Sequence, residues 1–223
     1  VGMPVEVTFD AVPGHIFRGT VMQVAPVSSA EKGSTNYTVD VDVADLDPGL
    51  RWGMTAFVNI RPAENVNVMF CSIECNRSMP LADDPRSAGF VKDLKDWSNL
   101  TDNIFMWDYV VQFRTYLCPF PNFHVLQPNI QLFHSQNIPI MFQQGSGSSW
   151  SDLAELKQYF IAKLLWNPDL NSDSLINRFI DKYYGNAAPF IGEYFELSHS
   201  SLKTAADTLN LDIYGLPSYY FKS

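Results

Sequence analysis

Residues 66–74 have the sequence Val-Asn-Val-Met-Phe-Cys-Ser-Ile-Glu, the first of three apolar runs that decide the fold. The second run, residues 104–111, is Ile-Phe-Met-Trp-Asp-Tyr-Val-Val, and the third, residues 138–143, is Ile-Pro-Ile-Met-Phe-Gln. Such near-continuous apolar runs are typical of strands in a parallel sheet that is covered on both faces. Residues 88–97 have the apolar spacing of a helix, as does a shorter stretch that ends near Ser135. This alternation of strand and helix predicts an α/β unit with a parallel sheet.

Further helices are predicted after the third run. Residues 152–166 place four large apolar side chains on one stripe of a helix, namely Leu153, Leu156, Phe160 and Leu164. Residues 172–183 have the pattern of another helix, with Gly185 in a position typical of a helix end, and a last helix is predicted for about residues 187–208. Between the second run and the short helix, a loop is indicated by three prolines, Pro119, Pro121 and Pro128.

Residues 1–62 have a different pattern, in which apolar and polar residues alternate. The alternation is clearest in residues 37–43, and similar short runs occupy residues 5–9, 17–24 and 54–60. A period of two residues indicates strands with one buried face, and residues 28–36 are predicted to be a polar connection between them. We therefore expect a small antiparallel β-barrel or sandwich ahead of the α/β unit.

The composition of the chain supports two domains. Only five of the 16 Phe, 10 Tyr and 5 Trp residues lie within residues 1–62, and residues 61–65 form a polar segment that contains Pro62. A change of this size within 223 residues indicates two units of different origin. We predict one domain at residues 1–62 and a second at residues 63–223.

Charge and residue counts limit the partners and cofactors of the chain. The formal net charge is -9, which argues against a basic face for nucleic acid and against anchoring on an anionic membrane surface. No run of about 18 apolar residues occurs and no leader sequence is recognisable, so we expect no direct membrane insertion. The three cysteines suit neither a disulfide framework nor a zinc site, and the four histidines lack metal-ligand spacing. We predict no metal and no cofactor.

Short motifs in the first domain stand in a fixed order: Val1-Gly-Met-Pro-Val5, Phe17-Arg-Gly-Thr-Val21, Val24-Ala-Pro26, Tyr37-Thr-Val39 and Leu50-Arg-Trp-Gly-Met-Thr-Ala56. Over residues 1–60 this order resembles the β-barrel domain of HlyD-type membrane fusion proteins, the periplasmic adaptors of tripartite efflux pumps. The family's lipoyl domain, α-hairpin and membrane-proximal domain are not recognisable in the chain. The resemblance implies a scaffold that contacts efflux-pump components and carries no catalytic residues.

The second domain also carries ordered motifs: Ile73-Glu-Cys-Asn-Arg-Ser78, Met106-Trp-Asp-Tyr109, Pro119-Phe-Pro-Asn122, Phe142-Gln-Gln-Gly145, Lys163-Leu-Leu-Trp-Asn-Pro-Asp169 and Tyr183-Tyr-Gly185. From about Val66 to Ser200 they resemble a bacterial carbohydrate-associated family known as domain of unknown function 4838. Members of that family resemble the (β/α)8 barrels of α-glucuronidases and hexosaminidases. The resemblance implies the C-terminal half of such a barrel, a carbohydrate ligand, and a periplasmic or secreted location.

Polar and aromatic side chains follow the apolar runs, at the ends where parallel sheets bind ligands. The first run ends at Glu74 and the second contains Asp108, so these two carboxylates are predicted to lie at one end of the sheet in one concavity. Adjacent strands are about 4.8 Å apart, which fits the separation of about 5–9.5 Å between the two carboxyl groups of glycoside hydrolases. One carboxylate would protonate the glycosidic oxygen, and the other would act as nucleophile or base. The substrate-binding candidates are Asn76, Arg77, Trp107, Tyr109, Gln143 and Gln144.

Structural roles for the same residues remain open. Glu74 and Arg77 form an ion pair at the strand end in one alternative, and Gln143 and Gln144 cap backbone groups in another. Because neighbours on a strand face opposite ways, at least one of the aromatic residues beside Asp108 is expected to be structural.

Three functional hypotheses follow. The first is a carbohydrate-associated, glycoside-hydrolase-like protein that binds polysaccharide or cleaves its glycosidic bonds. The second is a periplasmic adaptor subunit of an efflux or secretion system. The third is a join of two unrelated fragments with no activity of its own.

Overall fold

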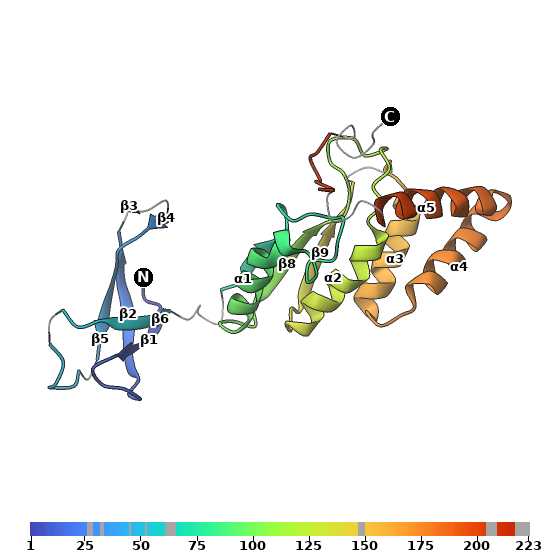
Figure 1. The fold of residues 1–223 in the computed structure, drawn as a ribbon. Helices are drawn as coiled ribbons and strands as arrows, with labels where there is room; N and C mark the ends of the chain where they lie inside the picture. Colours follow the sequence, from blue (N-terminus) through green and yellow to red (C-terminus); the bar gives the residue numbers. More distant parts are fainter. Residues whose placement is uncertain are drawn as a thin grey trace. The chain divides into compact units, whose positions relative to one another are not determined.

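The computed structural model describes residues 1–25, 29–31, 34–44, 46–51, 53–60, 66–146, 150–203 and 209–216. The chain forms two compact units, Val1–Asn67 and Val68–Ser223 (Figure 1). Each unit has its own hydrophobic core.

The first unit is built on an open antiparallel sheet. Its strands follow the order β5-β2-β1-β6, with the bounds β1 Pro4–Phe9, β2 Phe17–Val24, β5 Val39–Val43 and β6 Ala56–Ile60. Every pairing is antiparallel, as the two-residue period predicts, and the core consists of Val5, Val7, Phe17 and Val21. Within the described residues β5 and β6 do not pair with each other, so the sheet is not the closed barrel that was one of the two predictions. Four short strands are too few to close a sheet on itself.

Residues 28–36, predicted as a polar connection, contain a small two-stranded sheet instead. β3, Ser29–Glu31, pairs antiparallel with β4, Ser34–Asn36. The pairing satisfies backbone groups and requires no apolar face. The alternation that identifies the other strands is therefore missing from this segment.

Gly19 in β2 lies unusually close to its neighbours. A Cβ atom on Gly19 would stand 2.5 Å from the backbone carbonyl oxygen of Asp42 and 3.0 Å from a methyl group of Val5. The Asp42 carbonyl belongs to the segment paired with β2, so it cannot retreat without disturbing the sheet. We expect Gly19→Ala to lower the free energy of unfolding of the first unit by about 1–3 kcal/mol.

Hydrogen exchange of the β1 and β2 amides measures this effect. Gly89→Ala is the matched control, because a Cβ there meets nothing within 4 Å and Gly89 lies in a helix of the second unit. Equal protection of β1 and β2 in the Gly19 variant and the native chain would contradict the prediction.

The second unit contains the predicted parallel sheet. Its strands are β7 Val68–Cys71, β8 Ile104–Tyr109 and β9 Ile140–Gln144, in the order β7-β8-β9. The connections contain the 3₁₀ turn Pro85–Ser87 and α1 Ala88–Ser98 between β7 and β8, and α2 Phe123–Ser135 between β8 and β9. Both pairings are parallel, which confirms the prediction for this part of the chain.

Several element bounds differ from the prediction by two residues or more, and two of these differences have a clear physical reason. β7 ends at Cys71 and not at Glu74, because the side chain of Ser72 turns into a buried hydrogen bond and the chain then enters a turn. α2 already begins at Phe123, so Pro128 lies inside the helix and not in the loop. Burial of Phe123, Leu126 and Ile130 on one side of α2 outweighs the backbone hydrogen bond that Pro128 cannot donate.

The helices after the sheet are α3 Ala154–Trp166, α4 Ser172–Tyr184 and α5 Ala188–Lys203, with a 3₁₀ turn at Gly185–Ala187. Three members of the predicted stripe on α3 are fully buried: Leu156, Phe160 and Leu164. Gly185 ends α4 with a φ of 53°, a conformation that favours glycine. The predicted continuation of α5 to residue 208 lies outside the described residues.

The two faces of the parallel sheet have different surroundings. Ile104 and Met106 point into a core that the sheet shares with α1 and α2. On the opposite face Met69, Ile140 and Phe142 are 54%, 54% and 43% exposed. At the carboxyl end of this second face Tyr109 joins a smaller cluster with Phe120, Leu202, Leu211 and Ile213, and Trp107 packs against this cluster while remaining half-buried.

Candidate functional site

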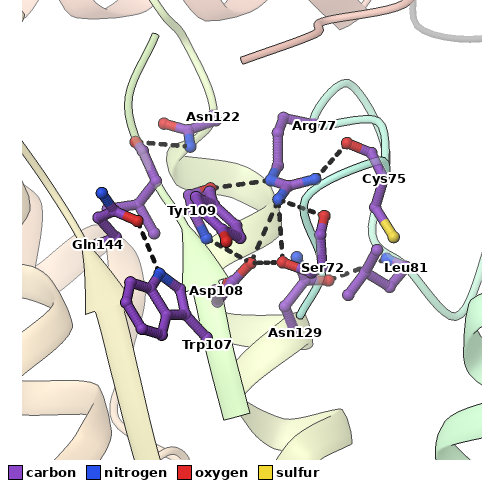
Figure 2. Close-up of polar contacts among 11 residues, drawn as sticks. Ser72, Cys75, Arg77, Leu81, Trp107, Asp108, Tyr109, Asn122, Asn129 and Gln144 are labelled. Atoms are coloured by element: carbon purple, nitrogen blue, oxygen red, sulfur yellow. Dashed lines mark hydrogen bonds and ion pairs between the residues drawn. The ribbon is translucent and has the colours of Figure 1, made fainter. Parts of the chain in front are cut away.

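Arg77 is the centre of a buried polar network at the carboxyl ends of β7 and β8 (Figure 2). Its Nε donates to the carbonyl oxygen of Tyr109 at 2.9 Å, and its Nη1 donates to the carbonyl of Cys75. Its Nη2 donates to the carbonyl oxygen of Ser72 at 2.8 Å and to the Ser72 hydroxyl at 3.0 Å. The guanidinium therefore joins the loop after β7 to the end of β8.

Asp108 is the carboxylate partner of Arg77. Its Oδ1 lies 3.4 Å from Arg77 Nη2, and it also accepts from the Ser72 hydroxyl and from the backbone N–H of Tyr109 at 2.9 Å. Asp108 is only 2% exposed, whereas Glu74 lies in an exposed turn. The ion pair at this end of the sheet thus joins Arg77 to Asp108, and not to Glu74 as one alternative had it.

Burial in this network also affects a neighbouring thiol. Desolvation raises the pKa of Cys75 to about 11, and the positive charge of Arg77 only partly opposes that rise. Cys75 is therefore a protonated, unreactive thiol at neutral pH.

Asn76 anchors a second set of backbone and side-chain groups. Its Nδ2 donates to the Ser78 hydroxyl at 2.6 Å and to Asp84 Oδ2 at 2.7 Å. Its Oδ1 accepts from the backbone N–H groups of Ser78 at 3.0 Å and Leu211 at 2.8 Å. This amide ties the loop after β7 to the C-terminal segment, so it would affect a ligand through the position of that loop.

Trp107 is held in a fixed orientation on the more exposed face of the sheet. Its indole Nε1 donates to Oε1 of Gln144 at 2.6 Å, as Figure 2 shows. The ring stacks against Tyr109 at a centroid distance of 6.3 Å and meets Phe142 edge-on at 5.0 Å. The register pairs Trp107 with Phe142 and Tyr109 with Gln144, so these four side chains share one face.

Gln143 lies on the opposite face, together with Asp108, with which it is paired in the register. Both polar atoms of its amide are buried and find no hydrogen-bond partner among the described residues. The structure therefore separates the predicted site residues. Trp107, Tyr109 and Gln144 share the aromatic face, and Arg77 and Asp108 form the buried ionic group. Glu74 is exposed, Asn76 anchors the loop after β7, and the buried amide of Gln143 has no partner among the described residues.

Ser72 is a member of the ionic group that the sequence did not single out. It donates to Asp108 and accepts from Arg77. The one signal in the sequence is its position as a polar residue within the first apolar run.

The described part of the chain shows no group of three or more His, Cys, Asp or Glu side chains that could hold a metal ion. Nor does any helix in that part combine the length and apolar character needed to cross a bilayer. Cys71, Cys75 and Cys118 do not take part in disulfide bonds.

Comparison with protein families gives two matches. The model described as "Domain of unknown function (DUF4838)" matches residues 51–196, which is more than half of the chain. The chain belongs to the DUF4838 family. The model described as "CusB-like, beta-barrel domain" matches residues 1–64. Both resemblances inferred from the motifs are thereby confirmed.

The two matches overlap in residues 51–64, a range that contains β6. β6 pairs with β1 along its length, so this part of the overlap belongs to the antiparallel sheet of the first unit and not to the parallel sheet of the second. Neither the curated proteins nor the solved structures contain a match to this DUF4838 member.

Proposed function

We propose that the second unit binds carbohydrate on the aromatic face of its parallel sheet. The observation that carries the proposal is Trp107, a half-buried indole whose orientation is fixed by Gln144 and by contacts with Tyr109 and Phe142. A pre-positioned aromatic ring offers a flat, electron-rich surface to the C–H groups of a sugar ring without loss of side-chain entropy on binding.

The location of Trp107 supports the same proposal. Trp107 lies at the carboxyl end of β8, and ligands of parallel α/β sheets bind at that end. Gln144, at the end of β9, can donate from its Nε2 to a sugar hydroxyl while its Oε1 accepts from the indole. We interpret the three strands as part of a (β/α)8 barrel, whose lumen would be the exposed face of this sheet.

Trp107→Ala is expected to weaken polysaccharide binding at least about tenfold, the loss typical of a central aromatic anchor. A glycan array followed by calorimetry on the selected glycan measures the loss. Trp166→Ala is the control, because Trp166 is 91% exposed at the end of α3 and lies outside the aromatic face. Equal weakening by both variants, or the absence of glycan binding by the folded native chain, would refute the proposal.

Hydrolysis would require Glu74 and Asp108 as a carboxylate pair. The burial of Asp108 beneath Arg77 and Ser72 favours binding without hydrolysis, since a catalytic carboxylate must reach the glycosidic bond. We expect Asp108→Asn to lower the free energy of unfolding by about 1–3 kcal/mol and to leave the glycan affinity of the folded protein nearly unchanged.

Denaturation and hydrolysis assays on the same Asp108→Asn protein separate the two roles. If hydrolysis is detected and this variant loses about 10²-fold in rate with an unchanged melting temperature, Asp108 is catalytic and the binding-only proposal is wrong.

The match of residues 1–64 to a CusB-like β-barrel domain favours a second function, for the first unit only. This function is contact with efflux-pump components in the periplasm. Cross-linking from Phe57, which is 62% exposed on β6, provides the test in bacterial envelopes. Capture of a pump protein supports the adaptor function, and its consistent absence supports the alternative that the chain joins two unrelated fragments.

A further inference from the structure

A pocket of about 570 Å³ lies between α3 and α4. Figure 1 shows these two helices as neighbours, joined by residues 167–171. The eight side chains that line the pocket are of only three kinds: three cations, three aromatic rings and two leucines. A volume of this size is within the range of small-molecule sites. The composition of the wall therefore decides which ligands fit.

The cations give the pocket an uncompensated positive charge. They are Lys163 from α3 and Arg178 and Lys182 from α4, all exposed, and no carboxylate of the described residues lines the pocket. Lys182 Nζ lies 3.1 Å from Oδ2 of Asp181, whereas neither Lys163 nor Arg178 has an ion pair among the described residues. Two cations thus lack a partner there, in a chain whose formal net charge is -9. A doubly negative group is their electrostatic complement.

The other lysine of α3 has a structural role and does not belong to this group. Lys157 is 3% exposed, and its Nζ donates to the carbonyl oxygen of Val110 at 3.2 Å. The rings of Phe120 and Phe123 lie 5.7 Å and 5.2 Å from that nitrogen. The fold therefore uses Lys157 internally, while Lys163 on the same helix is accessible to a ligand.

Aromatic rings form most of the apolar wall. Phe179 stacks with Tyr183 at a centroid distance of 4.8 Å and contacts Tyr159 at 5.0 Å. Tyr183 is 56% exposed, so part of this ring cluster faces solvent. Leu170 and Leu175 complete the wall. An aromatic ring of a ligand would find stacking or edge-to-face contacts here.

The cations and the rings are close to each other. Lys163 Nζ lies 5.7 Å from the ring centroid of Tyr159, and Arg178 directly precedes Phe179 in α4. An anionic group held by these cations would therefore place the body of the ligand beside the rings.

The same wall offers little to a sugar. The hydroxyls of Tyr159 and Tyr183 are the only uncharged polar side-chain groups of the described residues that line it. A sugar ring carries several hydroxyls, and each one that loses water without gaining a partner costs affinity. The wall therefore favours an aromatic body over a saccharide.

We propose that the pocket between α3 and α4 binds an aromatic ring that carries a phosphate group. The phosphate dianion accepts from Lys163 and Arg178, whose planar guanidinium can hold two phosphate oxygens at once. The ring packs against Phe179, Tyr183 and the two leucines. This site is formed by helices and is separate from the aromatic face that we propose for carbohydrate, which lies on β8 and β9.

Four probes test the proposal on the full chain, each titrated by calorimetry and NMR at constant ionic strength and about pH 7.5, where a phosphate monoester is mostly a dianion. They are phenyl phosphate, phenol, inorganic phosphate and glucose 6-phosphate. Phenol lacks the charge, inorganic phosphate lacks the ring, and glucose 6-phosphate has a hydroxyl-bearing ring in place of the arene. We expect phenyl phosphate to bind at least about tenfold more tightly than each of the other three.

Variants assign this preference to the two parts of the wall. Arg178→Met should weaken phenyl phosphate binding at least about tenfold and leave phenol unchanged, and Tyr183→Leu should weaken phenyl phosphate and leave inorganic phosphate unchanged. Arg114→Met and Phe190→Leu are the matched controls, because both side chains are exposed and neither lines the pocket. Trp107→Ala should also bind phenyl phosphate as the native chain does, so a failure of the carbohydrate proposal is distinguishable.

Three results would overturn the inference. The first is equal affinity for phenyl phosphate and inorganic phosphate, which would show that the cations act only as surface charge. The second is equal or tighter binding of glucose 6-phosphate, which would show that the ring chemistry is wrong. The third is native-like phenyl phosphate binding by Arg178→Met, or no binding of any probe by the native chain.

Discussion

Arg77→Met is expected to lower the free energy of unfolding of the second unit by about 3–5 kcal/mol. Arg77 is 1% exposed, and its guanidinium binds carbonyl oxygens of Ser72, Cys75 and Tyr109 as well as the carboxylate of Asp108. Methionine fills similar space but donates no hydrogen bond. The substitution therefore leaves Asp108 as a buried charge without its cation, together with carbonyls that lose their donor.

Chemical denaturation followed by tryptophan fluorescence measures this loss, because Trp52 is the one tryptophan of five that lies before residue 68. Arg178→Met is the control: Arg178 is exposed on α4, and its replacement should change stability by no more than about 0.5 kcal/mol. Adding Asp108→Leu to Arg77→Met should restore part of the stability, since an apolar pair tolerates burial better than a lone charge. A loss below about 1 kcal/mol for Arg77→Met would show that the network is not what holds the two strand ends together.

The parallel sheet was predictable from the sequence because its strands are buried on the helix side and nearly continuous in apolar residues. The apolar run in residues 66–74 identified β7, but it did not reveal that the strand stops at Cys71. The stop depends on Ser72, whose hydroxyl bonds to Asp108 on a strand that lies 36 residues further along the chain. A long-range hydrogen bond of this kind leaves no periodic pattern in the local sequence.

The candidate site was predictable in part. The sequence placed Trp107, Asp108 and Tyr109 in one candidate site and expected at least one of the two aromatic residues to be structural. The register instead places Trp107 and Tyr109 on one face of the sheet and Asp108 on the other. The partners of Arg77 were not predictable, because most of them are backbone carbonyls, which every residue possesses. Gln143 and Gln144 are equivalent in the sequence, yet the amide of Gln144 accepts from the indole of Trp107, and the amide of Gln143 is buried on the opposite face with no partner among the described residues.

The burial of Lys157 was not predictable from the sequence, for a different reason. Lys157 follows Leu156 in an amphipathic helix, where a lysine ordinarily extends to solvent. Its spacing of four residues from both Leu153 and Ile161 places it on the edge of the apolar stripe, which is the one sequence signal of its burial.

Lys157→Met is expected to change the pH dependence of stability by about 2–3 kcal/mol between pH 7 and pH 10. An unfolded lysine has its ordinary pKa of 10.5, whereas burial lowers the pKa of Lys157 in the folded chain to about 8. Between these two values the unfolded chain binds more protons than the folded chain, so the free energy of unfolding rises with pH over that interval.

The charged amine of Lys157 therefore destabilises the fold fully at pH 7, and this destabilisation decreases as the pH passes through 8 toward 10.5. The groups that face Lys157 are the rings of Phe120 and Phe123 and the side chain of Asp152, which acts on Lys157 through its charge. Denaturation of the native chain and of Lys157→Met at each pH gives the difference, in which the ionisation of buried tyrosine and cysteine side chains cancels. Methionine cannot titrate, so the advantage of the variant at pH 7 should shrink steadily on raising the pH. Parallel stability curves for the two proteins would show that Lys157 is not buried as a titrating amine.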